Sequence, residues 1–163
     1  MHHLKICIGI FLALAASRFV PHPPNFTSLF ALSFYIPVLF GIKFMPILVM
    51  SFIITDFIIG FHDVTFFTWG SVILICLLSR FFKSNITKRI SGALLGASLF
   101  YLITNFGVWS LGSYGFTLKG LILCYTLALP FFAYSLISTF IFSGLIETLY
   151  RLNIVKFINL KKT

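Results

Sequence analysis

Apolar residues occur in long runs along this chain, and short groups of charged residues, prolines and glycines separate the runs. A helix needs about 20 residues to cross the ~30 Å hydrocarbon core of a membrane, and most of the runs approach that length. The pattern therefore predicts an all-α protein, an integral membrane bundle of six transmembrane helices. The predicted helices cover residues 4–20, 26–41, 44–60, 66–82, 90–108 and 120–146.

The last of these runs is the longest, and Pro130 lies inside it. Proline lacks the N–H group that an interior helix position needs, so we expect a kink there. With no linker or repeat to divide the chain, residues 1–150 are predicted to form a single domain. Residues 151–163 alternate basic and apolar side chains, which is typical of a basic amphipathic tail on the cytoplasmic surface.

Composition supports the membrane interpretation and excludes an ordinary soluble domain. Hydrophobic residues make up 60% of the chain and charged residues only 9%, whereas soluble domains carry about 25% charged residues. The net charge of +9 is then better explained by topology than by nucleic-acid binding.

The cations are divided unevenly between the two predicted faces. Cationic residues in short loops stay in the cytoplasm, which places the N- and C-termini inside. Arg18 and Lys119 alone fall on the outer side, and ten of the 12 Lys and Arg residues fall inside: Lys5, Lys43, Arg80, Lys83, Lys88, Arg89, Arg151, Lys156, Lys161 and Lys162. An alternative for the first run remains open, because Lys5 followed by an apolar stretch also fits a cleavable signal peptide over residues 1–17.

Polar residues inside the runs gather at one depth. At 1.5 Å per residue, Asp56 lies roughly 18 Å along its helix and Arg18 and Asn105 lie roughly 21–22 Å along theirs, all toward the outer side. Ionisable groups inside a membrane are costly and often functional. Two explanations follow: a structural Arg18–Asp56 ion pair with interfacial neighbours, or an outward-facing ligand pocket. The candidate substrate-binding residues are Asn25, Thr27, Asp56, His62, Asp63, Asn105, Trp109 and Tyr125.

Signatures of catalysis are missing from the sequence. It contains no HExxH, nucleophile elbow, P-loop or catalytic carboxylate pair, so we expect a protein that is not an enzyme. Cys7, Cys76 and Cys124 lie in apolar runs and are interpreted as buried hydrophobic residues. We expect no cofactor, no metal and no nucleic acid, and expect the partners to be a small-molecule substrate and membrane lipid.

Small residues form two stripes. Gly9, Ala13 and Ser17 recur every four residues in the first run, and Gly92 and Gly96 recur beside alanines in the fifth. Such stripes let helices approach closely in lipid. Each one indicates either internal packing or docking of a partner subunit, and the first is our candidate docking surface.

Four blocks of sequence carry a resemblance to a known group of proteins: Pro23-Pro24-Asn25-Phe26-Thr27, residues 55–62, residues 104–109, and residues 120–132. At these blocks the chain resembles a family of uncharacterised small bacterial membrane proteins that looks related to the S components of energy-coupling factor transporters. S components are six-helix proteins that bind a vitamin or similar micronutrient near the outer face and dock onto a transmembrane coupling subunit with ATPases. The stripe of Gly9, Ala13 and Ser17 is similar to their docking motif, with Gly and Ser in place of Ala at two positions.

The resemblance implies a substrate-binding component for uptake of a vitamin-like solute, located in the bacterial cytoplasmic (inner) membrane as a multi-pass protein. The alternative function is a non-transporting structural or assembly subunit of a membrane complex.

Overall fold

The computed structural model describes residues 2–152, and all regular structure within that range is helical. The all-α prediction is therefore confirmed. In chain order the elements are α1 (His2–Phe19), α2 (Leu29–Phe40), the 3-10 turn η1 (Ile42–Phe44), α3 (Met45–Ile59), α4 (Thr65–Leu78), η2 (Ser79–Phe82), α5 (Ile86–Ser110), α6 (Leu118–Leu127) and α7 (Leu129–Arg151).

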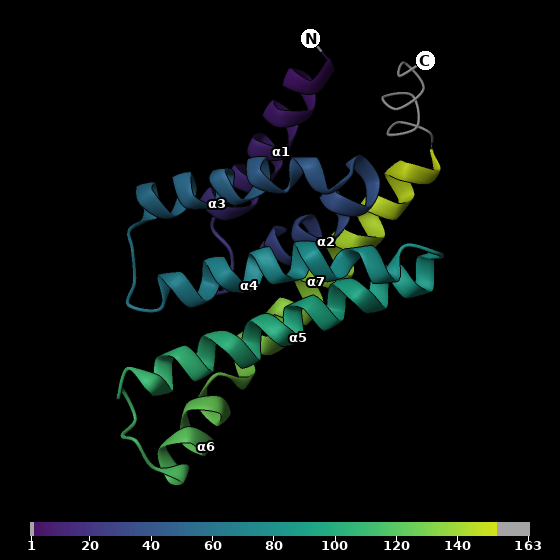
Figure 1. The fold of residues 1–163 in the computed structure, drawn as a ribbon. Coiled ribbons are helices and arrows are strands. Elements are labelled where there is room, and N and C mark those ends of the chain that lie inside the picture. The colour runs from purple at the N-terminus through teal and green to yellow at the C-terminus, as the bar shows by residue number, and fades with distance from the viewer. Residues whose placement is uncertain (1, 153–163) are drawn as a thin grey trace.

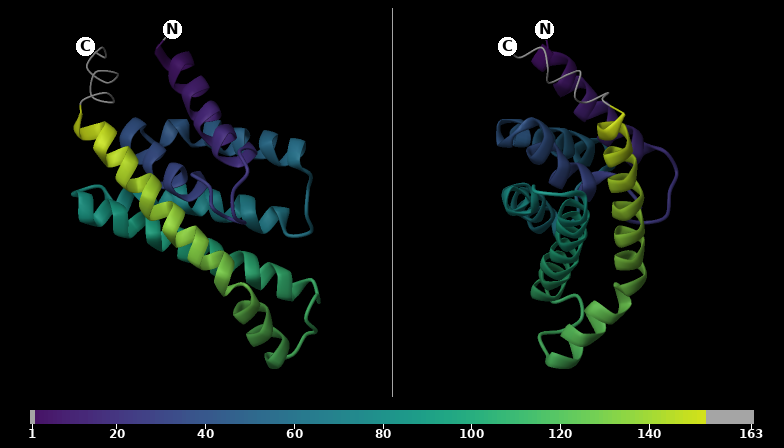
Figure 2. Two further views of the ribbon diagram at one scale, coloured as in Figure 1. Left: turned by 180° about the vertical axis from the view of Figure 1, so that it is seen from behind. Right: turned by 90° about the vertical axis from the view of Figure 1, so that its right-hand side faces the viewer.

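The helices form one bundle around α2. Helices α3, α4 and α5 run side by side, α7 packs across α5, and α6 projects at the far end of the α5–α7 pair (Figure 1). The start of α1 and the end of α7 lie toward the same end of the molecule in all three views (Figure 2).

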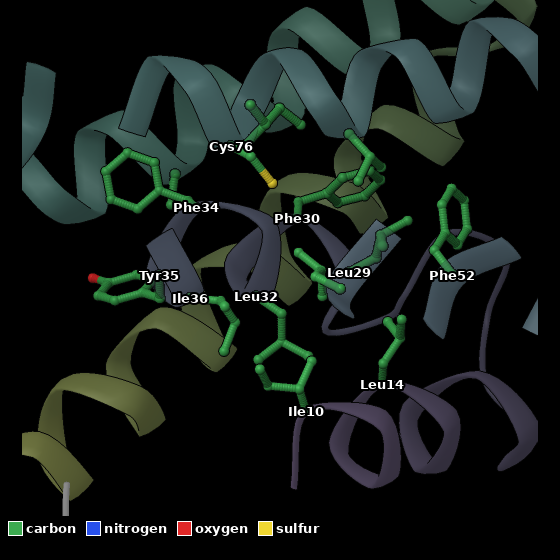
Figure 3. Close-up of a cluster of buried hydrophobic side chains, with 14 of the residues drawn as sticks. Ile10, Leu14, Leu29, Phe30, Leu32, Phe34, Tyr35, Ile36, Phe52 and Cys76 are labelled. Carbon is green, nitrogen blue, oxygen red and sulfur yellow. The ribbon is translucent and has the colours of Figure 1, made fainter. Parts of the chain in front are cut away.

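Helix α2 is the centre of the core. Its residues from Leu29 to Pro37 are all buried, and they contact α1, α3, α4, α5 and α7 (Figure 3). A helix that is apolar on every side is either enclosed by other elements or surrounded by lipid, and the contacts of α2 show the first case. At about 1.5 Å per residue its 12 residues extend only about 18 Å, so α2 is a buried core helix and is too short to cross the membrane alone.

Four helical segments are long and apolar enough to span a membrane: Ile42–Ile59, Thr65–Phe82, Ile86–Ser110 and Leu129–Arg151. They indicate a membrane protein. Helices α2 and α6 are apolar but shorter. The six predicted runs thus correspond to helices of unequal length rather than to six equivalent spans.

The sixth predicted run divides into two helices. Helix α6 ends at Leu127 and α7 begins at Leu129, with Pro130 in the first turn of α7. Proline is tolerated in a first turn because its missing N–H has no partner there in any case. The chain direction therefore changes at Ala128, directly beside the proline that predicted the kink.

The two small-residue stripes have different surroundings. A methyl group on Gly92 would lie 2.5 Å from the Phe34 ring, and one on Gly96 would lie 2.9 Å from Ile75, so the α5 stripe is internal packing. By contrast, Gly9 and Ala13 are exposed, and a methyl group on Gly9 would meet no heavy atom within 4 Å. The third residue of that stripe, Ser17, is partly buried and its hydroxyl lies 2.7 Å from that of Ser28, so it packs within the chain and does not belong to the exposed face. Of the predicted cytoplasmic tail, residues 153–163 lie outside the described range.

Candidate functional site

A cavity of about 490 Å³ opens at the end of the bundle where α1 and α3 finish and α4 begins. Ligand sites for small molecules occupy about 300–1,000 Å³ and combine apolar walls with a few polar groups. Its charged and polar lining comprises Arg18, His22, Asn25, Thr27, Asp56, His62, Thr68, Tyr101, Thr104, Asn105 and Ser135. The volume of the cavity and the chemistry of its lining are thus both typical of a small-molecule site.

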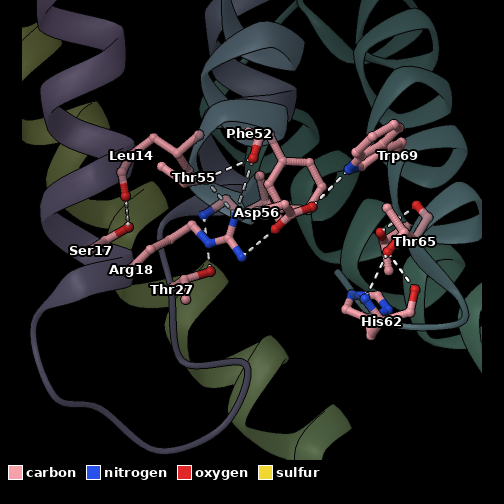
Figure 4. Close-up of polar contacts among 12 residues, drawn as sticks. Leu14, Ser17, Arg18, Thr27, Phe52, Thr55, Asp56, His62, Thr65 and Trp69 are labelled. Carbon is pink, nitrogen blue, oxygen red and sulfur yellow. Dashed lines mark hydrogen bonds and ion pairs between the residues drawn. The ribbon is translucent and has the colours of Figure 1, made fainter. Parts of the chain in front are cut away.

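An ion pair forms one wall of the cavity. Arg18 Nη2 lies 2.6 Å from Asp56 Oδ1, and Asp56 is only 2% exposed. Arg18 Nη1 also donates to Thr55 Oγ1 at 2.6 Å, and the guanidinium carbon lies 4.6 Å from the centre of the Phe52 ring. These contacts pin α1 to α3 (Figure 4). The structural ion pair predicted from the sequence is therefore present, and it lines the cavity as well.

The second carboxylate oxygen of Asp56 is also occupied. Trp69 Nε1 donates to Asp56 Oδ2 at 2.7 Å, which ties α4 to the same acid (Figure 4). Asp56 therefore links three helices, and its position is fixed by partners on both oxygens. A buried carboxylate held in this way meets the requirement that buried charges be paired and hydrogen-bonded.

Aromatic rings form much of the remaining wall. Tyr101 of α5 stacks on Phe132 of α7 with ring centres 4.4 Å apart, and Phe30 of α2 lies 4.6 Å from Phe100 of α5. Ring faces of this kind suit a planar aromatic solute. Hydroxyl and amide groups of Thr104, Asn105 and Ser135 lie on the same two helices, α5 and α7.

Five of the eight predicted substrate-binding residues line this cavity. They come from the α1–α2 connection, from α3, from the α3–α4 connection and from α5: Asn25, Thr27, Asp56, His62 and Asn105. Residues far apart in the sequence thus meet at one depth.

Asp63, Trp109 and Tyr125 do not line the cavity. Asp63 is an exposed residue of the α3–α4 connection. Trp109 donates to the Thr117 carbonyl at 3.3 Å, and Tyr125 Oη donates to the Leu102 carbonyl at 2.6 Å. Trp109 therefore holds the loop before α6 against α5, and Tyr125 holds α6 itself against α5.

Several lining residues were not anticipated from the sequence. Tyr101, Thr104 and Ser135 are polar positions inside apolar runs, and Thr68 and His22 lie on neighbouring elements. The depth of Thr104 could have been calculated from the sequence, because it directly precedes Asn105. Which side of its helix faces the cavity could not be predicted, since that depends on how α5 and α7 pack.

A second buried ion pair lies toward the end of the bundle opposite the cavity, where α5 begins and α7 finishes. Glu147 of α7 is 3% exposed and receives two bonds from Arg89 of α5, from Nε to Oε1 at 2.6 Å and from Nη2 to Oε2 at 2.7 Å. Tyr35 of the central helix α2 donates to Oε1 at 2.9 Å. Arg89 is one of the cations that the sequence predicts on the cytoplasmic side, and no role was predicted for Glu147.

Small hydroxyl residues lie on the buried side of α7 between these two ends of the bundle. The buried residues of this helix are Ser135, Ser138, Thr139, Ser143 and Glu147, while its large apolar side chains are mainly exposed. Large exposed apolar surfaces of this kind mark contact with a membrane or another protein. The pattern supports an orientation in which α7 faces the membrane with its apolar side.

Comparison with known proteins gives a family without an assigned role. Residues 1–160 match a protein family described as a family of unknown function (DUF6580). No curated protein and no solved structure matches the chain.

Proposed function

We propose that this chain, which belongs to DUF6580, a family of unknown function, is the substrate-binding membrane component of an uptake transporter. Its mode of action would be similar to that of an energy-coupling factor S component. It captures a vitamin-like small solute from the outer side of a bacterial inner membrane. The observation that carries this proposal is the cavity of about 490 Å³ at one end of the bundle.

The lining indicates the class of solute. Arg18 and Asp56 are paired with each other, so the cavity offers no unpaired carboxylate or guanidinium to a strongly charged ligand. Hydroxyl and amide groups stand beside stacked aromatic rings. This combination favours a planar, largely uncharged solute with several hydrogen-bonding groups.

Mass spectrometry of solvent-extracted, detergent-purified protein tests the proposal. We expect one small molecule at a 1:1 ratio to protein. Replacing Val108, a half-buried residue of the cavity wall, by Trp should reduce its retention more than about tenfold, because an overlap costing over about 1.4 kcal/mol has that effect.

Trp109→Ala is the matched control, since Trp109 is the next residue along α5 and does not line the cavity. It should retain the solute. Equal retention by wild type and Val108→Trp would reject the cavity as the binding site.

The exposed face of α1 is the docking surface in this proposal, and the partner is a transmembrane coupling subunit with ATPases. Gly9 and Ala13 line a mainly apolar groove of about 300 Å³ between α1 and α2. Without a hydrophobic driving force in lipid, helix association depends on close approach of small residues.

Ala13→Trp should abolish cellular uptake of the co-purified solute while leaving its retention by the isolated protein unchanged, because Ala13 is exposed. Uptake assays and extraction of the same variant measure the two effects. Met50→Trp, on an exposed position of α3, is the control and should preserve uptake. Normal uptake by Ala13→Trp would exclude this face as the docking surface.

One observation favours the alternative, a non-transporting structural or assembly subunit. Both buried acids, Asp56 and Glu147, are fully engaged by partners in the same chain. In that case the extraction experiment would yield no solute, and the Val108→Trp variant would behave as wild type in every assay.

A further inference from the structure

A small pocket with two cations lies at the end of the bundle away from the large cavity. It has a volume of about 160 Å³ and lies where the α2–η1 connection meets η2, between the C-terminal ends of α2 and α4. Its rim carries Arg80 and Lys83, and its apolar lining is Pro37, Ile42 and Leu77. At ~30 Å³ per water molecule the pocket holds the equivalent of about five waters, too little for a drug-sized ligand.

The two cations have no acidic partner in the described part of the chain, where the ion pairs are Arg18–Asp56 and Arg89–Glu147. The whole chain holds only three acidic residues against 12 Lys and Arg, and the third, Asp63, belongs to the connection at the cavity end. Within the described residues, Arg80 and Lys83 are therefore exposed cations without an acidic neighbour, free to meet an anion from another molecule.

The pocket lies at the ends of two candidate membrane spans. Ile42 is the first residue of one candidate span, and Arg80 lies in the last turn of another that ends at Phe82. The ends of apolar spans lie at the headgroup level of a bilayer. Phe81, exposed at 66%, places an apolar ring beside Arg80, whose guanidinium carbon is 5.0 Å from the ring centre.

From these observations we infer that the pocket binds the phosphate group of an anionic phospholipid. Arg80 and Lys83 meet the headgroup, while Ile42, Leu77 and Phe81 contact the upper part of its acyl chains. Basic pockets between transmembrane helices bind anionic headgroups in this way, and each Lys or Arg near the surface contributes a factor of about five in affinity. The site is separate from the solute cavity and stands whether or not the proposed transport function holds.

Native mass spectrometry of the full chain in detergent, titrated with dioleoyl phosphatidylglycerol, tests the inference. Dioleoyl phosphatidylcholine is the comparison, because it shares the chains and the phosphate but has no net charge. We expect wild type to prefer phosphatidylglycerol by at least about fivefold. The double variant Arg80→Gln/Lys83→Gln should lose that preference, with a fall of roughly 25-fold in phosphatidylglycerol affinity.

Two control variants separate a site from a general charge effect. Lys88→Gln removes an exposed cation at the start of α5 that does not line the pocket, so phosphatidylglycerol binding should be unchanged. Arg80→Lys keeps the charge and should retain most of the affinity. All three changed positions are exposed, and thermal unfolding of each variant verifies that the fold is intact.

In the lipid titrations, three results would overturn the inference: equal affinity of wild type for the two lipids, wild-type affinity in the double variant, or an equal loss in Lys88→Gln. An excess of inorganic phosphate is the final arm, and we expect it to leave bound phosphatidylglycerol in place. Displacement by inorganic phosphate would assign the pocket to a free phosphate ion and reject the lipid.

Discussion

Replacing Glu147 by Gln should lower the stability of the protein by about 3–5 kcal/mol, because the substitution leaves the largely buried Arg89 side chain, 15% exposed, without a counter-charge. Gln has nearly the same shape as Glu, so lost packing contributes little. Thermal or denaturant unfolding in detergent measures the change. The expected loss is large because Glu147 receives three hydrogen bonds, two from Arg89 and one from Tyr35.

The control is a variant that removes both charges together. Arg89→Met/Glu147→Leu with Tyr35→Phe replaces the pair and the hydroxyl that donates to it by apolar groups of similar volume, which is often neutral or stabilising for a buried ion pair. We expect it to recover most of the stability lost in Glu147→Gln. A loss below about 1 kcal/mol in the single variant, as for an exposed ion pair, would show that the pair is not buried as described.

Replacing Asp56 by Asn should have two effects at once. Stability should again fall by about 3–5 kcal/mol, since Arg18 loses its counter-charge. Retention of the co-purified solute should also fall, because Asp56 and Arg18 both line the cavity and Arg18 loses the strongest of the contacts that position it. Unfolding and solvent extraction of the same preparation measure the two effects.

Glu147→Gln is the matched comparison for the second effect. It breaks an ion pair of the same kind, but neither Glu147 nor Arg89 lines the cavity. At a temperature where both variants are folded, solute retention should therefore drop in Asp56→Asn and remain in Glu147→Gln. Equal retention in the two variants would mean that Asp56 has a structural role only.

Depth along a helix could be predicted from the sequence, and the facing direction could not. The rise per residue placed Arg18, Asp56 and Asn105 at a common level, and the three line one cavity. Trp109 satisfied the same depth rule. Its ring contacts Phe106 and Phe116 and its N–H donates to Thr117, because the loop before α6 folds back over that part of α5.

Hydrophobicity alone also could not separate a membrane helix from a central one. The sequence predicts a transmembrane helix over residues 26–41, but α2 is enclosed by five other helices. Its polar residue Tyr35 then gains a role, as the donor to Glu147. Pairing between Tyr35 and Glu147 joins residues 112 positions apart, a distance over which no local pattern carries information.

Fluorescence of Trp69 tests the proposed solute site most directly. The chain has two Trp residues, so Trp109→Phe leaves Trp69 as the sole reporter, and its indole N–H is bonded to the cavity residue Asp56. When the co-purified solute is titrated into ligand-free Trp109→Phe protein, we predict a saturable change in Trp69 emission that ends at one solute per chain. Emission that stays constant, or that drifts linearly without saturation as for partition into detergent, would contradict binding in this cavity.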